Sequence, residues 1–141
     1  MTPGSDDPFA PDEAQRKREA RERAIELLYE AQLKDVSVTE VIEHELIPPD
    51  PFAVALATGI AAAVPELDER ISELLRSGWT IERLAILDLW ILRLGIHELG
   101  LGDAPAAVVM SEAVELASAY GATDDSSRFV NGVLAAAARA E

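Results

Sequence analysis

Apolar residues recur every three to four positions along most of the chain, which is the spacing of one face of an α-helix. From Asp12 onward no stretch alternates apolar and polar residues in the manner of a β-strand. The pattern therefore predicts an all-α fold. The first predicted helix runs roughly from Glu13 to Lys34 and buries one apolar face. That face carries Ala20, Ala24, Leu27, Leu28 and Ala31.

Capping residues divide the next part of the chain into shorter helices. Ser37, followed three residues later by Glu40, has the form of a capping box and begins a second helix that ends before two consecutive prolines. Asp50 and Pro51 begin a third helix, because aspartate accepts bonds from free amide groups and proline fits the first helical position. Pro65 breaks this third helix or starts a fourth one.

Glycine and threonine mark the boundaries of the fifth predicted helix. The fourth helix is expected to end at Ser77 and Gly78. Thr80 is the expected N-cap of the fifth helix, with Trp79 and Leu84 packing across it as a hydrophobic staple. The fifth helix then runs from residue 81 to about residue 99 and is apolar on nearly every side. Only a helix surrounded by others buries all its faces, so this one should be central.

Two more helices complete the predicted fold. Pro105 begins the sixth, Gly121 ends it, and an acidic turn that includes Asp125 begins the seventh. A chain of 141 residues with 49% hydrophobic content fits one domain. We therefore expect a single domain of about seven helices over residues 12–141, preceded by a disordered acidic tail over residues 1–11.

The compartment follows from what the sequence lacks. It has no cysteine, which excludes disulfides and thiolate metal sites, and its first residues have no basic and apolar signal pattern. The most apolar segment, residues 84–99, contains Asp88 and Arg93, and charges at mid-membrane depth are costly. We therefore expect a cytoplasmic protein with a buried core helix at this segment.

The charge is strongly acidic, with one local exception. The formal net charge of −14 repels phosphate on average. Five of the twelve basic residues, however, fall in one run: Arg16, Lys17, Arg18, Arg21 and Arg23. This run either neutralises RNA phosphates or forms a solvated helix face with Glu19 paired to Arg23. Arg18 and Arg21 are expected to be exposed.

Residues for catalysis are few, and an enzyme is not expected. The two histidines lie on different predicted helices: His44 faces solvent, and His97 is a core or rim residue. The neighbouring Asp124 and Asp125 are explained by helix capping rather than by a metal site. We expect no metal and no cofactor.

Each of three aromatic residues has two possible roles. Tyr120 and Phe129 flank the turn between the last two helices, where each ring either packs in the core or stacks on a base. Tyr29 lies beside the apolar face of the first helix and is either buried or a contact for a partner.

In three segments the sequence resembles the NusB family. They are ARERAIELLYEAQL (20–33), ILDLWILRLGIHEL (86–99) and VVMSEAVELASAYGATDDSSRFVNGVL (108–134), in the family's order and within a similarity that spans about residues 16–138. The resemblance implies two three-helix groups that share a long central helix. It also implies a factor that binds boxA-type RNA together with NusE, a small-subunit ribosomal protein, and helps RNA polymerase to read through terminators and to transcribe ribosomal RNA.

The resemblance also assigns site residues. The implied RNA contacts are Arg16, Lys17, Arg18, Arg21, Tyr120, Asp125 and Phe129. The implied NusE contacts are Tyr29 and Asp88.

Several positions depart from the family pattern, among them His97, which stands where a tyrosine is usual. Glu19 interrupts the basic run and weakens its attraction for RNA. Leu89 and Trp90 stand where a basic and a small residue are usual, which enlarges an apolar surface and either alters the partner interface or favours a homodimer. The alternative function is therefore a NusB-like paralogue that binds proteins and has little or no affinity for RNA.

Overall fold

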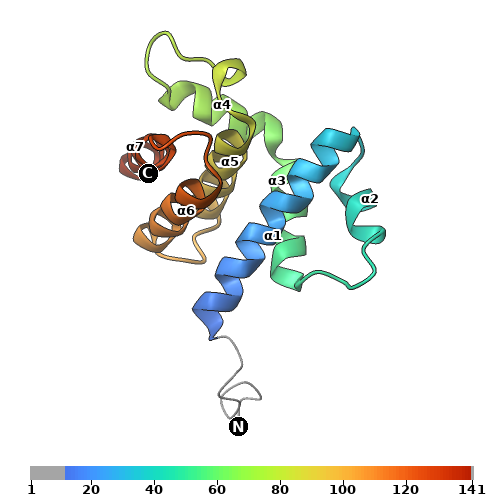
Figure 1. Ribbon diagram of the computed structural model, residues 1–141. Coiled ribbons are helices and arrows are strands. Elements are labelled where there is room, and N and C mark those ends of the chain that lie inside the picture. The colour runs from blue at the N-terminus through green and yellow to red at the C-terminus, as the bar shows by residue number, and fades with distance from the viewer. Residues whose placement is uncertain (1–11, 141) are drawn as a thin grey trace.

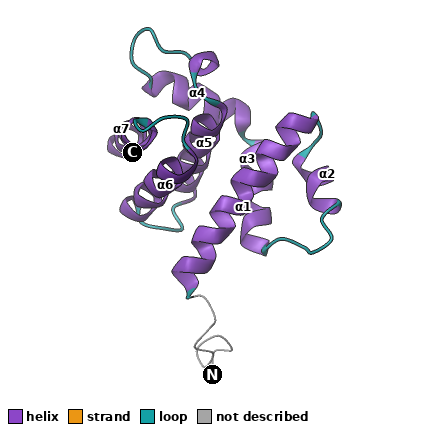
Figure 2. Ribbon diagram, in the orientation of Figure 1, coloured by secondary structure: helices purple, strands orange, loops and turns teal. Residues whose placement is uncertain are grey.

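The computed structural model describes residues 12–140, and all regular structure in that range is helical (Figures 1 and 2). The expected tail over residues 1–11 lies outside the described residues. The helices are α1 (Glu13–Lys34), α2 (Val38–Glu43), α3 (Pro51–Ala62), α4 (Val64–Leu74), α5 (Ile86–Leu101), α6 (Ala106–Tyr120) and α7 (Ser126–Arg139), with a 3-10 turn η1 (Ile81–Arg83) before α5. The all-α prediction is confirmed.

The helices form two groups that share α5. Helices α1, α2 and α3 pack against one another, and α4, α6 and α7 surround the other side of α5 (Figure 1). Since α5 packs against α1 and α3 as well as against α4, α6 and α7, the prediction of a central helix is confirmed. The central helix is not the longest, because α5 has 16 residues and α1 has 22.

The early helix boundaries follow the predicted caps. The bounds of α1 are those expected from its apolar face. Ser37 accepts a hydrogen bond from the backbone N–H of Glu40 at 3.1 Å, and Asp50 accepts one from Phe52 at 2.8 Å, with Pro51 in the first turn of α3. These bonds satisfy amide groups that have no partner inside the helix, so local sequence was sufficient to place both starts.

The start of α5 was predicted wrongly. Helix α4 ends at Leu74, Thr80 precedes only the 3-10 turn, and α5 begins at Ile86 after an extended Ala85. Trp79 does not form the expected staple with Leu84 in a continuous helix; its ring lies 6.3 Å from the ring of Phe129 on α7. A contact between residues so distant in sequence is invisible to local capping rules.

The core lies where α5 meets both groups. Leu27, Ile60, Ile91 and Leu134 are fully buried side chains from α1, α3, α5 and α7. Helices α5 and α7 approach closely at Gly95, where an added Cβ would lie 2.7 Å from a methyl carbon of Leu134. Within the described residues no helix alone is long and apolar enough to cross a membrane; α3 and α4 meet that criterion only as a pair, bent by 74°.

Candidate nucleic-acid interface

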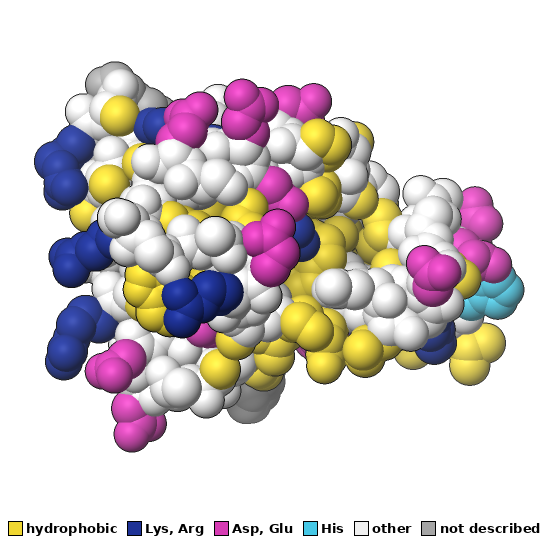
Figure 3. All heavy atoms as spheres, turned by 90° about the horizontal axis from the view of Figure 1, so that it is seen from above, with side chains coloured by type: hydrophobic (Ala, Val, Ile, Leu, Met, Phe, Trp, Pro, Cys, Tyr) yellow, Lys and Arg dark blue, Asp and Glu magenta, His cyan; other side chains and the backbone are white. Residues whose placement is uncertain are grey.

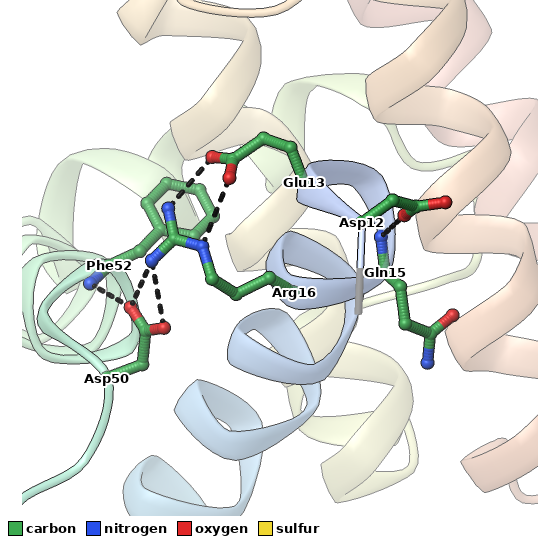
Figure 4. A network of polar contacts seen from close by, with 6 residues as sticks. All are labelled: Asp12, Glu13, Gln15, Arg16, Asp50 and Phe52. Carbon is green, nitrogen blue, oxygen red and sulfur yellow. Dashed lines mark hydrogen bonds and ion pairs between the residues drawn. The ribbon is translucent and has the colours of Figure 1, made fainter. Parts of the chain in front are cut away.

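Arg16 begins the basic run on α1 and is held between two carboxylates (Figure 4). Its guanidinium donates to Glu13 at 2.8 Å and to Asp50 at 3.0 Å. The hydrogen bond that Arg16 donates to Glu13 is the main cause that raises the pKa of Arg16, and the same bond lowers the pKa of Glu13. Both groups therefore stay charged, and much of the field of Arg16 is compensated within the chain.

Arg18 and Arg23 also find acidic partners on other elements. Arg18 donates to Glu112 of α6 at 3.0 Å, a hydrogen bond that raises the pKa of Arg18. Arg23 lies 2.8 Å from Glu45, which follows α2, and does not form the expected pair with Glu19. Pairs between distant segments thus replace the pair expected along one helix.

Arg21 is buried, so the expectation that it is exposed was wrong. Only 3% of it is accessible, and its guanidinium donates to both oxygens of Glu98 on α5, at 2.7 and 2.9 Å. The ring of Phe52 lies 5.7 Å from the same guanidinium. The charge of Arg21 is tolerated in the core because the carboxylate of Glu98 on α5 pairs with it. Arg21 joins α1 to α5 and does not offer its charge to solvent.

Lys17 is the least compensated member of the run. Its ammonium group lies 5.8 Å from the centre of the Phe52 ring and, among residues 12–140, makes no ion pair. Lys17 is therefore the member of the run whose charge is most available to a ligand.

The corner between α6 and α7 carries the three other expected RNA contacts. Tyr120 is 41% exposed at the end of α6, and its hydroxyl lies 3.4 Å from Glu22, whose charge raises the pKa of Tyr120. Asp125 is exposed and occupies the N-cap position of α7. Contrary to expectation, its side chain makes no capping hydrogen bond. Phe129 is half-buried and packs on the core. The exposure of Tyr120 is what a stacking contact needs.

Asp88 is buried, and its carboxylate points inward instead of toward a partner. One oxygen accepts a hydrogen bond from the Ser126 hydroxyl at 3.1 Å, and the other from the backbone N–H of Ala122 at 3.3 Å. Asp88 on α5 therefore fastens the turn between α6 and α7. Tyr29, the other residue expected at a partner surface, is half-buried against the core.

Trp90 is buried too, which corrects the expected enlargement of an exposed apolar surface. It is 6% exposed, its indole N–H donates to Gln32 at 2.7 Å, and the guanidinium of Arg93 lies 4.4 Å from its ring centre. Its ring lines a hollow of about 500 Å³ between α1, α2 and α3. The larger side chain thus fills space inside the molecule.

The histidines lie where the sequence placed them. His44 is exposed at the end of α2, with its ring nitrogen Nδ1 2.7 Å from the carbonyl oxygen of Glu40. His97 is half-buried against Gly59, and burial lowers its pKa. Within the described part of the chain, no three side chains of His, Asp or Glu come together in a way that suits a metal ion.

A second basic region, which the sequence analysis does not predict, lies between the end of α4 and α7. A groove of about 490 Å³ is lined there by Leu74, Leu75, Arg76, Trp79, Asp125, Arg128, Phe129, Gly132, Val133, Ala136 and Arg139. Lys and Arg side chains gather at the left edge of Figure 3, the side on which α4 and α7 lie in Figure 1. The signal that would have found it is the alternation of basic and aromatic residues at Arg76 and Trp79 and at Arg128 and Phe129.

Comparison with known proteins gives the family. The model of the NusB family matches residues 18–139, which is most of the chain. The chain belongs to the NusB family. Among curated NusB proteins, the transcription antitermination protein NusB of Bacillus subtilis (strain 168) is 41% identical over 122 residues, covering 84% of this chain and 92% of that protein. The NusB of Thermobifida fusca (strain YX) is also 41% identical, covering 84% and 85%.

Solved NusB structures share the fold. NusB from T. maritima superposes with a TM-score of 0.78 at 29% identity, covering 87% of this chain and 90% of that one. The structure of the antitermination factors NusB and NusE in complex with double-stranded RNA gives a TM-score of 0.74 at 29% identity, covering 89% and 98%. The helical arrangement of this chain is therefore that of the NusB family.

Proposed function

We propose that this chain is a transcription antitermination factor that binds RNA together with NusE. The observation that carries the proposal is its similarity to a NusB chain solved with NusE and RNA, over 89% of this chain and 98% of the other. The curated relatives at 41% identity carry the name of transcription antitermination protein, which supports the same role. The RNA is a boxA-type sequence, and the complex acts on RNA polymerase during ribosomal RNA transcription.

The RNA surface joins the start of α1 to the corner between α6 and α7. The phosphate contacts proposed on α1 are Lys17, whose charge is least compensated, with Arg16 and Arg18 beside it. Arg18 is already bonded to Glu112 of α6, so this pair connects the start of α1 to α6. Single-stranded bases stack on aromatic rings, and Tyr120 and Phe129 provide these, with Asp125 accepting bonds from base amino groups.

Two other residues act on this surface from inside. Arg21 positions α1 through its buried pair with Glu98, in place of the direct RNA contact first expected. Asp88 positions the corner that carries the rings, since it fastens the turn before α7. The NusE contact that we propose at the surface is Tyr29, half-buried on α1, whereas Asp88 is buried and acts from inside the fold.

A second candidate is a NusB-like module that binds proteins and has lost useful affinity for RNA. The observation in its favour is that four of the five basic residues of the run form ion pairs within the chain. The net charge of −14 acts in the same direction. RNA must therefore displace acidic partners from Arg16 and Arg18 before these residues neutralise phosphates.

The test is the binding of a labelled boxA RNA to the purified chain, with and without purified NusE, followed by fluorescence anisotropy at low and near-physiological salt. The proposal predicts that NusE increases the RNA affinity and that salt weakens it, since binding releases counterions. A scrambled RNA is the control. Association with NusE that brings no gain in RNA affinity would replace the proposal with the second candidate.

A further inference from the structure

The arginines around the groove between α4 and α7 are compensated less than those on α1. Arg76 and Arg139 form no ion pair among residues 12–140. Arg128 has only a 3.8 Å contact with Asp125, and both side chains are more than 80% exposed, where such a pair contributes little. The groove thus holds three arginines against one aspartate in a chain of net charge −14. The groove is therefore locally basic, whereas the chain as a whole is acidic.

The same groove has an exposed aromatic platform. Trp79 is 49% exposed, and its ring lies 6.3 Å from that of Phe129, tilted by 40°. The guanidinium of Arg83 lies 4.8 Å from the ring centre of Trp79 and donates to the carbonyl of Gly78, which holds the ring in place. A flat, exposed ring held beside basic side chains suits nucleobases, which stack on aromatic faces.

We propose that this groove is a further subsite for single-stranded RNA, in which a base stacks on Trp79 and the adjoining phosphates pair with Arg76 and Arg139. The inference rests on the proposed function, and it extends the RNA path from Phe129 across α7 toward the end of α4. Most basic residues of the run on α1 are paired with carboxylates of the chain itself, so the run alone offers few phosphate contacts. The subsite in the groove supplies additional ones. It therefore accounts for how an acidic protein retains affinity for RNA.

Charge and chemistry favour RNA over a protein segment as the occupant. Basic side chains neutralise phosphates and release counterions, and interleaved aromatic rings accept bases of any sequence. A peptide that suited the groove would have to be acidic, and the single carboxylate in the lining, Asp125, accepts hydrogen bonds from base amino groups as readily as from peptide groups. The rings and the arginines together select a nucleic acid.

The experiment compares four variants with wild type, using a labelled boxA RNA extended by several nucleotides at each end and with NusE present. Trp79→Ala removes the ring, Trp79→Phe keeps an aromatic face, and Arg76→Glu reverses one groove charge. Arg70→Glu is the matched control, because it makes the same charge change on α4 at a residue outside the groove lining. Circular dichroism and thermal unfolding establish that each variant is folded.

We expect Trp79→Ala and Arg76→Glu to weaken RNA binding by about 10-fold, as for the loss of one stacked base or one phosphate contact. Trp79→Phe should retain most of the affinity, and Arg70→Glu should bind as wild type. For Arg76→Glu the negative slope of log affinity against log salt concentration should become less steep by about 0.7, the value for one phosphate on a single strand.

Three results would overturn the inference in distinguishable ways. If wild type binds the RNA and the groove variants bind it equally well, the subsite is wrong and the proposed function stands. If the variants lose NusE and keep RNA binding in its absence, the groove is a protein surface. If wild type binds no RNA under any condition, the proposed function itself fails.

Discussion

The buried pair of Arg21 and Glu98 differs in kind from the other ion pairs on α1. Both side chains are less than a tenth exposed and make two hydrogen bonds at 2.7 and 2.9 Å. Removing one partner of such a pair leaves the other charge buried and unpaired, which lowers stability strongly. Exposed pairs are screened by solvent and contribute little to stability. Residues that look alike in the basic run therefore differ sharply in their effect on stability.

The variant Glu98→Ala tests this difference. It should lower the free energy of unfolding by about 3 to 5 kcal/mol, because Arg21 remains buried without its carboxylate. The control is Glu73→Ala, which removes the exposed partner of Arg70 and should cost less than about 1 kcal/mol. Urea denaturation measures both. Equal losses in the two variants would show that the buried pair has no special role.

His97 gives the stability a dependence on pH. Burial lowers its pKa, against a smaller opposing effect from the charge of Glu98. The folded protein therefore binds fewer protons than the unfolded chain once the pH falls below about 6.5, so the contribution of His97 is present above that pH and is lost below it.

Replacing His97 with Gln should reduce this loss. Between about pH 7.5 and about pH 5.5, His97→Gln should lose less stability than wild type, since the variant has no imidazole to protonate there. His44→Gln, at an exposed position, is the control and should follow wild type. Denaturation at each pH measures the difference. A variant that loses as much stability as wild type would contradict the account of His97.

At the scale of elements, the sequence predicted what local chemistry decides. The apolar face gave α1 its bounds, and Ser37 and Asp50 marked two helix starts, because a cap and its amide groups are neighbours in sequence. The start of α5 failed because Trp79 packs on Phe129 of α7. The same reason explains the basic run, since the partner of Arg18, Glu112, lies 94 residues away. The RNA contacts come from the resemblance to the NusB family and stay a prediction, and the tertiary contacts show which of their charges are paired within the chain.

The turn between α6 and α7 depends on α5 through Asp88. Replacing Asp88 with Ala leaves the hydroxyl of Ser126 and the amide of Ala122 without their acceptor and should cost about 1 to 3 kcal/mol. Hydrogen exchange at Ala122 should become faster. The matched control in the same turn is Asp125→Ala, which breaks no cap bond and should stay within about 0.5 kcal/mol of wild type. Unchanged exchange at Ala122 in Asp88→Ala would refute the fastening role.

At the scale of the whole molecule, an acidic protein has basic groups on two surfaces with different degrees of compensation. The net charge is −14, the run on α1 is largely paired within the chain, and the groove beside α7 is largely unpaired. Long-range repulsion of RNA makes binding depend on local contacts and on a partner that adds positive charge or RNA contacts of its own. This distribution is consistent with the proposed role, in which the chain binds RNA together with NusE.

The most direct test of the central claim is transcription through a terminator in an extract of the source organism from which this chain has been removed. Templates carry either an intact or a scrambled boxA sequence upstream of the terminator, and the fraction of full-length transcript is measured. The account predicts that restoring the chain raises read-through on the intact template and leaves the scrambled template unchanged. Equal read-through on both templates, with and without the chain, would contradict an antitermination function.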